Sequence, residues 1–510
     1  MRLEKPAPRE WIDRARPLAF TFEGKRYPGF AGDTISSALA ANGVAVLGRS
    51  FKYHRPRGLL SAANHDVNAM FQHGGTPNVR GDATLLEDGM TLTAVNTFGG
   101  GVDHDRGRFL GLLSRFLPVG FYYKAFHTKA LFPLWEKLFR ATTGLGKVDF
   151  STPRHKTPKA YDFCDVLVIG GGPSGLAAAL AAAESGAQAV LVDENARLGG
   201  SGLYQLGGDE DRARTTALLI EQVEAHPKIR VRAATYAAGW YKDNWVPLVD
   251  EKRLTKMRAK TVILASGAFE QPAVFRHNDL PGVLLASAAQ RLMHRYGVQV
   301  AQNPVLLVAN PDGYRAALDQ LAAGGKVAAV VDLRAGHAAG DLQRQIEAQG
   351  VPVLAASIVA EALPGAGGKC VAGVKVAAFD GLNADLSRLQ EIACDGVWLS
   401  VGWAPAANLA YQAGTQMRYD TALQQFVPQT LPEAFFMCGK VNGVHALKSK
   451  LADGHRAGKA AAAFLGKGDA PSPTIPAEVE APSHPWPIVV HPKGKNFVDF
   501  DEDIQYQDIA

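Results

Sequence analysis

The sequence predicts an α/β fold containing two Rossmann-like units of the kind that bind dinucleotides. Three observations lead to this prediction. From Asp165 to about Gly466, strand-like and helix-like segments alternate, which is typical of a parallel sheet. A glycine-rich turn directly follows the first strand of that region. A second strand–helix–strand pattern, at about residues 300–390, repeats the arrangement without the glycines.

The chain has 510 residues, so about three domains are expected. Its formal net charge of +5 is small for this length, and no Lys/Arg run resembles a nucleic-acid-binding tail. The four cysteines form no C-x-x-C pair and no ligand spacing, which argues against a redox dithiol, an iron–sulfur cluster or another metal site. With no secretory signal and no apolar run of about 18 residues, a cytoplasmic location is expected.

Residues 1–98 are expected to form the first domain, a small β-rich module. The segment Phe20–Tyr27 has a hairpin pattern, with Gly24-Lys25 near the turn. Thr34–Asn42 is predicted to be a helix with Asp33 as its N-cap, and Thr91–Val95 a strand.

Residues 99–158 are expected to form a helical, aromatic insert that ends in the polar linker Ser151–Lys159. Apolar side chains recur from Phe109 to Phe139 with largely helical spacing. Packing in the core or between domains is the favoured interpretation, because apolar stripes usually do this. A subunit interface is the alternative.

The region 159–466 is predicted to be the nucleotide-binding domain, and Tyr161–Asn195 carries its main motif. An apolar strand runs into Gly170, Gly172 and Gly175, which permit a tight turn, approach of a pyrophosphate, and close packing of the next helix. The helix N-terminus offers free N–H groups to an anion. A second strand ends at Asp193, 18 residues after Gly175, where a ribose-binding carboxylate is expected. The predicted cofactor-binding residues of this unit also include Pro173, Ser174, Glu194, Arg197, Gly200 and Ser201.

The second unit is expected to have lost its nucleotide. Its glycine positions are Ala309, Pro311 and Tyr314, although Asp332 again lies 18 residues after the last of these. Proline removes an N–H and tyrosine prevents close packing, so a scaffold without cofactor is favoured over a retained NAD(P)H site.

Two turns elsewhere in the region are assigned to the first nucleotide site. One contains Gly267 after the strand Thr261–Leu264, and the other contains Gly439 and Asn442 after Phe436-Met437. Two-dinucleotide flavoproteins usually carry Gly-Asp at the second turn, with the Asp at the flavin ribityl chain. The Asp position is Lys440 in this sequence, which argues against a conventional FAD.

A compact basic segment, Gly48–Gly58, is the remaining candidate site. It contains Arg49, Lys52, Arg55 and Arg57. A solvated basic loop and a clamp for a phosphate or carboxylate are both open, since guanidinium groups bind such anions bidentately. His54 in the same segment is interpreted as structural.

The chain resembles the α subunits of heterotetrameric sarcosine oxidases and related amine dehydrogenases over essentially its whole length. The segments that carry the resemblance are Ile12–Arg14, Leu18–Lys25, Gly32–Gly43, Gly48–Gly58, Phe116–Lys124 and Lys450–Gly458. The resemblance implies a glutathione-reductase-type pair of nucleotide domains, preceded by a β-grasp ferredoxin-like domain without cluster cysteines.

The family also implies the cofactors and partners. NAD is expected at the Gly170–Asp193 site, with FAD as the alternative there, and catalytic residues are not assigned. An FMN is expected at the interface with a β subunit, which carries FAD and the amine-binding site. Small γ and δ subunits complete the family's assembly. The basic cluster Arg49–Arg57 would then contact the FMN phosphate.

One departure from the family concerns residues 467–510, which are expected to be a connector. Family α subunits continue into a folate-binding, aminomethyltransferase-like domain, and Asn496–Ile504 resembles the segment leading into it. The folate module is therefore expected on a separate chain, or the sequence is a truncated product. The leading hypothesis is the NAD-binding component of an N-methyl amino acid oxidase. The alternatives are a dye-linked proline, hydroxyproline, opine or glycine dehydrogenase component, a scaffold with a structural nucleotide, and an autonomous flavoreductase.

Overall fold

The computed structural model describes residues 1–117, 120, 128–144, 146, 148–152, 156–336, 340–469, 475 and 481–509. The chain divides into two compact units. Unit 1 consists of Met1–Thr152, Pro272–Val401 and Trp486–Ala510, and unit 2 consists of Pro153–Gln271 and Gly402–Pro485. The stretch 159–466 therefore contributes to both units, with one Rossmann-like sheet in each.

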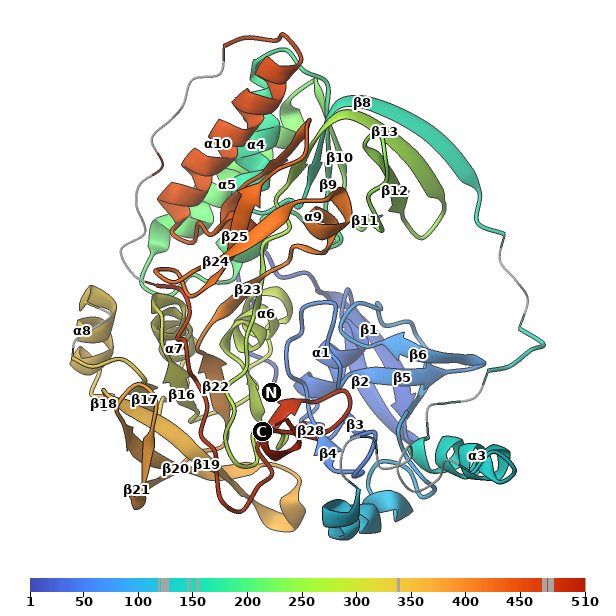
Figure 1. The fold of residues 1–510 in the computed structure, drawn as a ribbon, viewed down its shortest axis with the longest axis vertical. Helices are drawn as coiled ribbons and strands as arrows, with labels where there is room; N and C mark the ends of the chain where they lie inside the picture. The colour runs from blue at the N-terminus through green and yellow to red at the C-terminus, as the bar shows by residue number, and fades with distance from the viewer. Residues whose placement is uncertain are drawn as a thin grey trace. The chain divides into compact units, whose positions relative to one another are not determined.

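The first module of unit 1 is a five-stranded mixed sheet beside one helix (Figure 1). Its strand order is β2-β1-β7-β5-β6, with β1 and β7 parallel and the other pairs antiparallel. Phe20, Phe22, Ile35, Leu39 and Phe71 are buried in its core. The predicted hairpin is confirmed: Glu23 and Gly24 connect β1 and β2 with φ angles of 50° and 75°. The elements are β1 Asp13–Phe22, β2 Lys25–Ala31, α1 Ile35–Ala41, β5 Met70–His73, β6 Thr76–Arg80 and β7 Thr91–Ala94.

The N-cap of α1 is Thr34, so the prediction of Asp33 was wrong by one residue. Thr34 Oγ1 accepts a hydrogen bond from the N–H of Ser37 at 3.2 Å, and the N–H of Thr34 donates to Ser37 Oγ in return, as a capping box. Asp33 instead accepts from Ser37 Oγ at 2.6 Å and forms an ion pair with Arg2. A buried carboxylate needs such a partner, which is why it is not left to cap the helix.

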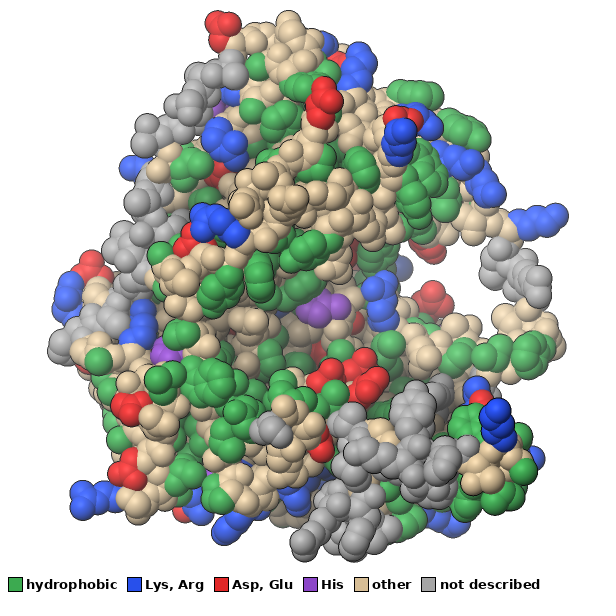
Figure 2. Space-filling model, in the orientation of Figure 1, with side chains coloured by type: hydrophobic (Ala, Val, Ile, Leu, Met, Phe, Trp, Pro, Cys, Tyr) green, Lys and Arg blue, Asp and Glu red, His purple; other side chains and the backbone are tan. Residues whose placement is uncertain are grey.

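The aromatic insert contains η1 (Arg106–Phe116) and α3 (Phe132–Thr143). None of the α3 side chains is buried, and Leu131, Phe132, Leu134 and Leu138 are 44–63% exposed. Figure 2 shows hydrophobic side chains at the surface over this helix. For α3 the favoured expectation of core packing is therefore wrong, because its apolar side stays exposed in the part of the chain that is described. Phe121 and Phe126, on which that expectation also relied, lie outside the described residues.

The second Rossmann-like sheet, also in unit 1, is parallel with strand order β15-β22-β16-β17-β18. Leu306, Leu307 and Trp398 lie fully buried at its centre. Its strands are β15 Val283–Leu285, β16 Val305–Val308, β17 Ala329–Asp332, β18 Val353–Leu354 and β22 Val397–Ser400. Its helices are α6 Ala286–Tyr296, α7 Pro311–Ala322 and α8 Gly340–Ala348, followed by an antiparallel sheet of β19 Ser357–Pro364, β20 Val371–Phe379 and β21 Ala384–Ala393.

The described part of residues 481–509 is structured rather than a bare connector. Strands β27 (Phe497–Asp499) and β28 (Ile504–Gln505) form a hairpin in unit 1. It lies beside the basic segment, whose short strands β3 (Gly48–Arg49) and β4 (Pro56–Arg57) pair with each other. Asp503 of the hairpin forms an ion pair with Arg57 and accepts the N–H groups of Lys52 and Tyr53 at 2.9 and 3.0 Å.

Unit 2 is built on a sheet with the order β10-β9-β8-β13-β12-β11, with β26 beside β13. Strands β10, β9, β8, β13 and β26 are parallel, and helices α4 and α10 lie side by side in Figure 1. A Cβ at Gly454 or Gly458 of α10 would lie 2.2–2.3 Å from a carbonyl oxygen of α4, so both positions require glycine. The strands are β8 Lys159–Ile169, β9 Ala189–Val192, β10 Ile229–Arg232, β11 Tyr236–Ala237, β12 Trp245–Val249, β13 Leu254–Leu264 and β26 Phe435–Met437.

The remaining elements of unit 2 cover the ends of this sheet. The helices are α4 Pro173–Glu184, η2 Gly200–Leu203, α5 Glu210–Ala225, α9 Asn408–Ala413, η4 Gly439–Asn442 and α10 Leu447–Phe464. Two small antiparallel pairs join β14 Ala268–Glu270 to β23 Trp403–Pro405, and β24 Gln416–Asp420 to β25 Gln425–Thr430. In the part of the chain that is described, no helix combines the length and the apolar character needed to cross a bilayer.

Candidate nucleotide site and basic pocket

The glycine turn of unit 2 has the geometry of a dinucleotide-binding loop. Gly170 ends β8 with φ +109°, and a Cβ there would lie 2.3 Å from the carbonyl oxygen of Ala265. A Cβ at Gly175 would lie 1.8 Å from the carbonyl oxygen of Gly170, so α4 packs against the turn as closely as a backbone can. A Cβ added at Gly172, the N-cap of α4, would meet nothing within 4 Å. The turn is thus tight on two sides and open at the N-terminus of α4.

The Asp193 carboxylate is buried and engaged within the protein. Oδ2 accepts the N–H of Gly171 at 2.6 Å, and Oδ1 accepts the N–H and side-chain amide of Asn195 at 2.8 and 2.9 Å. The acid at the end of β9 therefore braces the glycine turn directly. Glu194, the next residue, is exposed, as is Arg197. A ribose contact by Asp193 remains a prediction, and Glu194 is the exposed carboxylate next to it in the chain.

The other predicted site residues of unit 2 lie close to this turn. A Cβ at Gly200 would be 3.0 Å from Gly172 Cα, so the second glycine loop faces the first. A Cβ at Gly439 would be 2.4 Å from Ser174 Oγ. Asp453 of α10, which is fully buried, holds the Gly439–Asn442 turn by accepting from Gly439 N and Asn442 Nδ2 at 2.8 and 3.0 Å. Gly267 has φ +80° and open space at its Cβ position, three residues beyond the end of β13.

Two buried lysines complete the site, and sequence reasoning did not assign them to it. Lys440 is 6% exposed, with Nζ 3.4 Å from the Trp403 ring centroid and 3.4 Å from Gln205 Oε1. Lys450 is 2% exposed, and its Nζ donates to Ser201 Oγ at 3.1 Å. The available signal was position: Lys440 replaces an acid in the late turn, and Lys450 opens a segment that carries the family resemblance.

The polar groups present fit a nucleotide pyrophosphate. Ser174 Oγ and Gln205 Nε2 are buried with no hydrogen-bond partner, which is costly unless a ligand supplies one. They lie beside the N-terminus of α4, where free N–H groups and the helix dipole favour an anion. Lys440 and Lys450 add positive charge to the same place. Together these groups can bind and orient the phosphates of a dinucleotide.

The equivalent site in the second Rossmann-like unit is filled by the protein's own side chains. Asn310 caps α7 by accepting the N–H groups of Asp312 and Gly313 at 3.0 and 3.3 Å. Asp332, in the position of a ribose-binding acid, accepts from Tyr314 Oη at 2.8 Å and from Arg334 at 2.9 and 3.0 Å. These bonds satisfy the groups that a nucleotide would use, which supports the expected loss of a cofactor.

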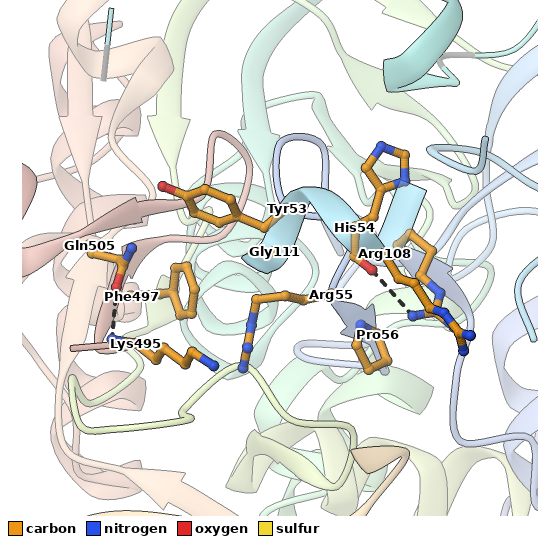
Figure 3. A pocket seen from close by; sticks show the side chains of 10 residues that line it. Tyr53, His54, Arg55, Pro56, Arg108, Gly111, Lys495, Phe497 and Gln505 are labelled. Atoms are coloured by element: carbon orange, nitrogen blue, oxygen red, sulfur yellow. Dashed lines mark hydrogen bonds between the residues drawn. The ribbon is translucent and has the colours of Figure 1, made fainter. Parts of the chain in front are cut away.

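The basic segment contributes to a pocket of about 220 Å³ in unit 1 (Figure 3). Arg49 and Arg55 line it, whereas Lys52 and Arg57 do not. His54, Arg108 and Lys495 also line the pocket, and sequence reasoning did not assign any of them to a site. Their only signal in the sequence is the basic character of the segment, because Arg108 and Lys495 are far away along the chain. The remaining lining residues are Tyr53, Pro56, Gly111, Phe497 and Gln505.

The arginines of the segment are held by internal partners. Arg55 binds Asp279 through two contacts at 2.6 and 2.8 Å, and Arg57 lies between Asp279 and Asp503. Arg49 donates to the carbonyl oxygens of Val102 and His54. The Lys52 ammonium is buried over the Tyr53 ring, and burial lowers its pKa. Arg55 and Arg57 therefore belong to one buried ion-pair network, and Arg55 is also part of the pocket wall.

His54 is the most unusual residue of the pocket. It is 1% exposed and has φ +53°, which costs energy for a residue other than glycine. Nδ1 lies 2.7 Å from Asp105 Oδ2, and Nε2 is buried without a partner. Figure 3 shows the ring at the rim of the pocket. The interpretation of His54 as purely structural therefore gives way to that of an oriented, strained side chain with one unused ring nitrogen.

The pocket is electropositive. Burial, together with the charges of Arg55 and Arg276, lowers the pKa of Lys495. Burial and the same two arginines lower the pKa of the neighbouring His277 to about 4. Cationic groups that depress one another's pKa values are stabilised by a bound anion. A phosphate or carboxylate is the ligand class that this pocket suits.

An iron–sulfur cluster does not fit the first module, because residues 1–98 contain no cysteine. The chain's four cysteines, Cys164, Cys370, Cys394 and Cys438, are unpaired, and burial raises the pKa of three of them. Among the described residues, no three His, Cys, Asp or Glu side chains are placed to hold a metal ion.

Comparison with known families agrees with this geometry. Residues 164–461 match the family described as pyridine nucleotide-disulphide oxidoreductase, and residues 15–97 match the 2Fe-2S iron-sulfur cluster binding domain. The chain belongs to the pyridine nucleotide-disulphide oxidoreductase family.

Curated relatives narrow the comparison. The chain is 35% identical to the alpha subunit of sarcosine oxidase from Rhizobium meliloti, over 98% of this chain and 51% of that subunit. It is 31% identical to the corresponding subunit of a Corynebacterium species, over 91% and 45%. A subunit of opine oxidase from Agrobacterium tumefaciens is 27% identical over 60% and 66%. The chain thus spans about half the length of the sarcosine oxidase subunits that it matches.

Among solved structures, L-proline dehydrogenase from P. horikoshii has a similar fold. The TM-score is 0.61 at 18% identity, over 91% of this chain and 77% of that chain. The similarity covers most of both units, which confirms the predicted fold class. It concerns the fold alone.

Proposed function

We propose that the chain is the NAD-binding component of a flavin-dependent oxidase that acts on sarcosine or another N-methyl amino acid. The observation that carries the proposal is the open glycine turn Gly170–Gly175 facing Lys440, in a chain similar to sarcosine oxidase α subunits over 98% of its length. The substrate and the flavin that oxidises it are assigned to a partner subunit.

The choice of NAD over FAD at this site rests on Lys440. A carboxylate at this turn accepts hydrogen bonds from a ribityl chain, whereas a buried ammonium donates and suits phosphate oxygens. Lys440 also lies over Trp403, and these two side chains occupy space beside the turn. Ser174, Gln205 and Lys450 would hold the pyrophosphate. Glu194 or Asp193 would accept from the ribose hydroxyls.

The basic pocket of unit 1 is assigned to the phosphate of an FMN at the interface with a β subunit. Its volume of about 220 Å³ and its Arg49, Arg108 and Lys495 side chains suit a phosphate group. The Nε2 of His54 would supply one further hydrogen bond. A bound flavin supplies the electron transfer from the amine to the acceptor, and this chain's residues bind and orient it.

Substitutions in the pocket test the FMN assignment. Arg55→Ala or Arg57→Ala also breaks the buried pairs with Asp279 and Asp503, so loss of FMN in these variants is ambiguous. Arg108→Gln and Lys495→Gln avoid those pairs, and the exposed Lys493→Gln is the matched control. We expect FMN occupancy of the co-expressed complex to fall at least tenfold in the double variant and to stay unchanged in the control. Full occupancy in the double variant would remove the assignment.

A second candidate function is the corresponding component of a dye-linked proline, hydroxyproline, opine or glycine dehydrogenase. The observation that favours it is the similarity to an opine oxidase subunit over 60% of the chain. The γ and δ subunits belong to the first proposal only.

Co-expression with a candidate β subunit decides between these functions. The purified complex is assayed with N-methylglycine, proline and an opine, with oxygen or a dye as acceptor. Oxygen consumption with N-methylglycine supports the oxidase, and dye reduction with proline or an opine supports the second candidate. The isolated chain should be nearly colourless and should bind NAD. A yellow isolated chain that oxidises NADH would overturn both and indicate an autonomous reductase.

A further inference from the structure

The first module keeps the spacing of a plant-type cluster loop without its cysteines. Plant-type ferredoxins bind the cluster through C-x₄-C-x₂-C and one later cysteine. In the matched domain, Ser61, Asp66 and Ala69 have the same spacing, with four and two residues between them. The pattern alone is weak, because no cysteine marks it.

The loop around Asp66 is folded about a single carboxylate oxygen. Asp66 Oδ2 accepts the N–H groups of Leu60, Ser61 and Ala62 at 2.8, 2.6 and 3.2 Å. Ala62 and Asn64 have φ angles of 46° and 64°, so the backbone is held in a left-handed conformation that turns these N–H groups inward. Iron–sulfur clusters in proteins accept hydrogen bonds at their sulfurs in a similar way.

Asp82 supplies the fourth position. Its Oδ2 accepts the N–H of Asp66 at 3.0 Å, and the preceding residue, Gly81, donates to the carbonyl oxygen of Ala69 at 2.7 Å. Ser61, Asp66, Ala69 and Asp82 thus meet at one place in the fold, and all four are buried. Ser61 Oγ and Asp82 Oδ1 are buried without a hydrogen-bond partner, as expected where side chains replace ligands of another kind.

The charge of the site also matches. A cluster with four thiolate ligands is anionic, and the loop has adapted to negative charge by its inward N–H groups. In this chain Asp66 and Asp82 supply the negative charge, while Arg291 donates to the carbonyl oxygen of Ser61 at 3.0 Å. An apolar replacement of Asp66 would leave three buried N–H groups unsatisfied.

We propose that Ser61, Asp66, Ala69 and Asp82 occupy the four ligand positions of a 2Fe–2S cluster, and that the Asp66 carboxylate takes the cluster's place as the anion that holds the loop. The module is then a ferredoxin-like fold that is stabilised by a carboxylate and contributes no redox centre at this position.

Restoring the ligands tests the proposal. In the full chain, Ser61→Cys, Asp66→Cys, Ala69→Cys and Asp82→Cys are combined, and the protein is treated anaerobically with ferrous iron and sulfide. We expect about two irons and two sulfides per chain, with visible circular dichroism from an ordered cluster. The matched control keeps the first three cysteines but carries Asp88→Cys, at an exposed turn, instead of Asp82→Cys. Uptake by the control equal to that of the first variant, or none by a folded first variant, would overturn the proposal.

A second measurement decides if the four-cysteine variant does not fold. In Asp66→Ala, hydrogen exchange at the amides of residues 60–62 should become at least tenfold faster, because they lose their common acceptor. Asp33→Ala is the control: it removes another buried carboxylate of the module and should leave these three amides protected. Unchanged exchange at 60–62 in Asp66→Ala would show that the carboxylate does not hold the loop.

Discussion

At the scale of single residues, the three glycines of the nucleotide turn have separable roles. Gly175 is needed for folding, because its Cβ position lies 1.8 Å from a carbonyl oxygen. Gly172 has an ordinary φ of −77° and free space around its Cβ position, so the protein itself does not require glycine there. Only a ligand approaching the N-terminus of α4 does.

We therefore expect opposite results from two alanine variants. Gly175→Ala should lower the free energy of unfolding by about 3 kcal/mol or more, because the helix must move away from the strand. Gly172→Ala should fold normally but bind NAD at least tenfold more weakly. Denaturant unfolding and calorimetric titration measure the two effects. Wild-type NAD affinity in Gly172→Ala would show that the nucleotide does not use this turn.

Asp82 makes the stability of unit 1 depend on pH. Burial, and the neighbouring Asp66 charge, raise its pKa to about 6, with only a small opposing effect of Arg80. A carboxyl whose pKa is raised in the folded state stabilises the fold below its unfolded pKa, and that contribution is lost as the pH rises through about 6.

Asp82→Asn should consequently stabilise the protein above pH 7, by about 1–3 kcal/mol, and have little effect near pH 4. The amide oxygen can still accept the N–H of Asp66. Urea unfolding at pH 4.5 and 7.5 measures the difference, with Asp88→Asn at an exposed turn as the control. A gain of the same size at both pH values would contradict the expected titration.

At the scale of elements, the second Rossmann-like unit shows how a nucleotide site is closed. The N-terminus of α7 is capped by Asn310, and Tyr314 and Arg334 bind the acid at the end of β17. Burial and the Asp332 charge raise the Tyr314 pKa, so its hydroxyl remains a donor to the carboxylate. The element retains its packing but its binding groups are used internally.

Tyr314→Phe should cost about 1–2 kcal/mol of stability, because the buried Asp332 oxygen loses one donor. It should not open a second nucleotide site, since Asn310 and Pro311 still block the helix N-terminus. Equilibrium dialysis should give one NAD per chain in the variant, as in the wild type. Binding of two equivalents would show that Tyr314 alone closes the site.

Elements with a local signal were predicted well from the sequence. The β1–β2 hairpin, the glycine turn and the parallel strands follow from spacing and residue type. The N-cap of α1 was missed because Asp33 and Thr34 are both good caps, and only the distant Arg2 decides between them. Exposure of α3 was missed because an apolar stripe does not show which surface it covers. In the basic segment, the partners Asp279, Lys495 and Asp503 are separated from it by more than two hundred residues.

At the scale of the whole molecule, segments far apart in the sequence complete unit 1. Met1–Thr152, Pro272–Val401 and Trp486–Ala510 share one set of contacts, and Asp503 links the hairpin β27–β28 to the basic segment. A fragment that ends near residue 152 would lack these partners, and Arg57 would be left without Asp279 and Asp503.

Asp503→Asn tests this dependence. It removes the charge that pairs with Arg57 and weakens acceptance from the N–H groups of Lys52 and Tyr53. We expect a loss of about 2–4 kcal/mol in unfolding free energy and faster proteolysis within Gly48–Gly58. Asp501→Asn, exposed in the same hairpin, is the control. Equal stability of both variants would mean that the hairpin is not coupled to the segment.

The contact between Arg57 and Asp503 also has a consequence for synthesis of the protein. The two residues are 446 positions apart. At about 5–20 residues per second, a ribosome needs roughly 20–90 s to travel from one to the other. During that interval the basic segment has emerged but lacks its carboxylate partners, so its arginines are exposed to polyanions in the cell. The pocket can form only late in translation, and loading of a phosphate-bearing cofactor must follow it.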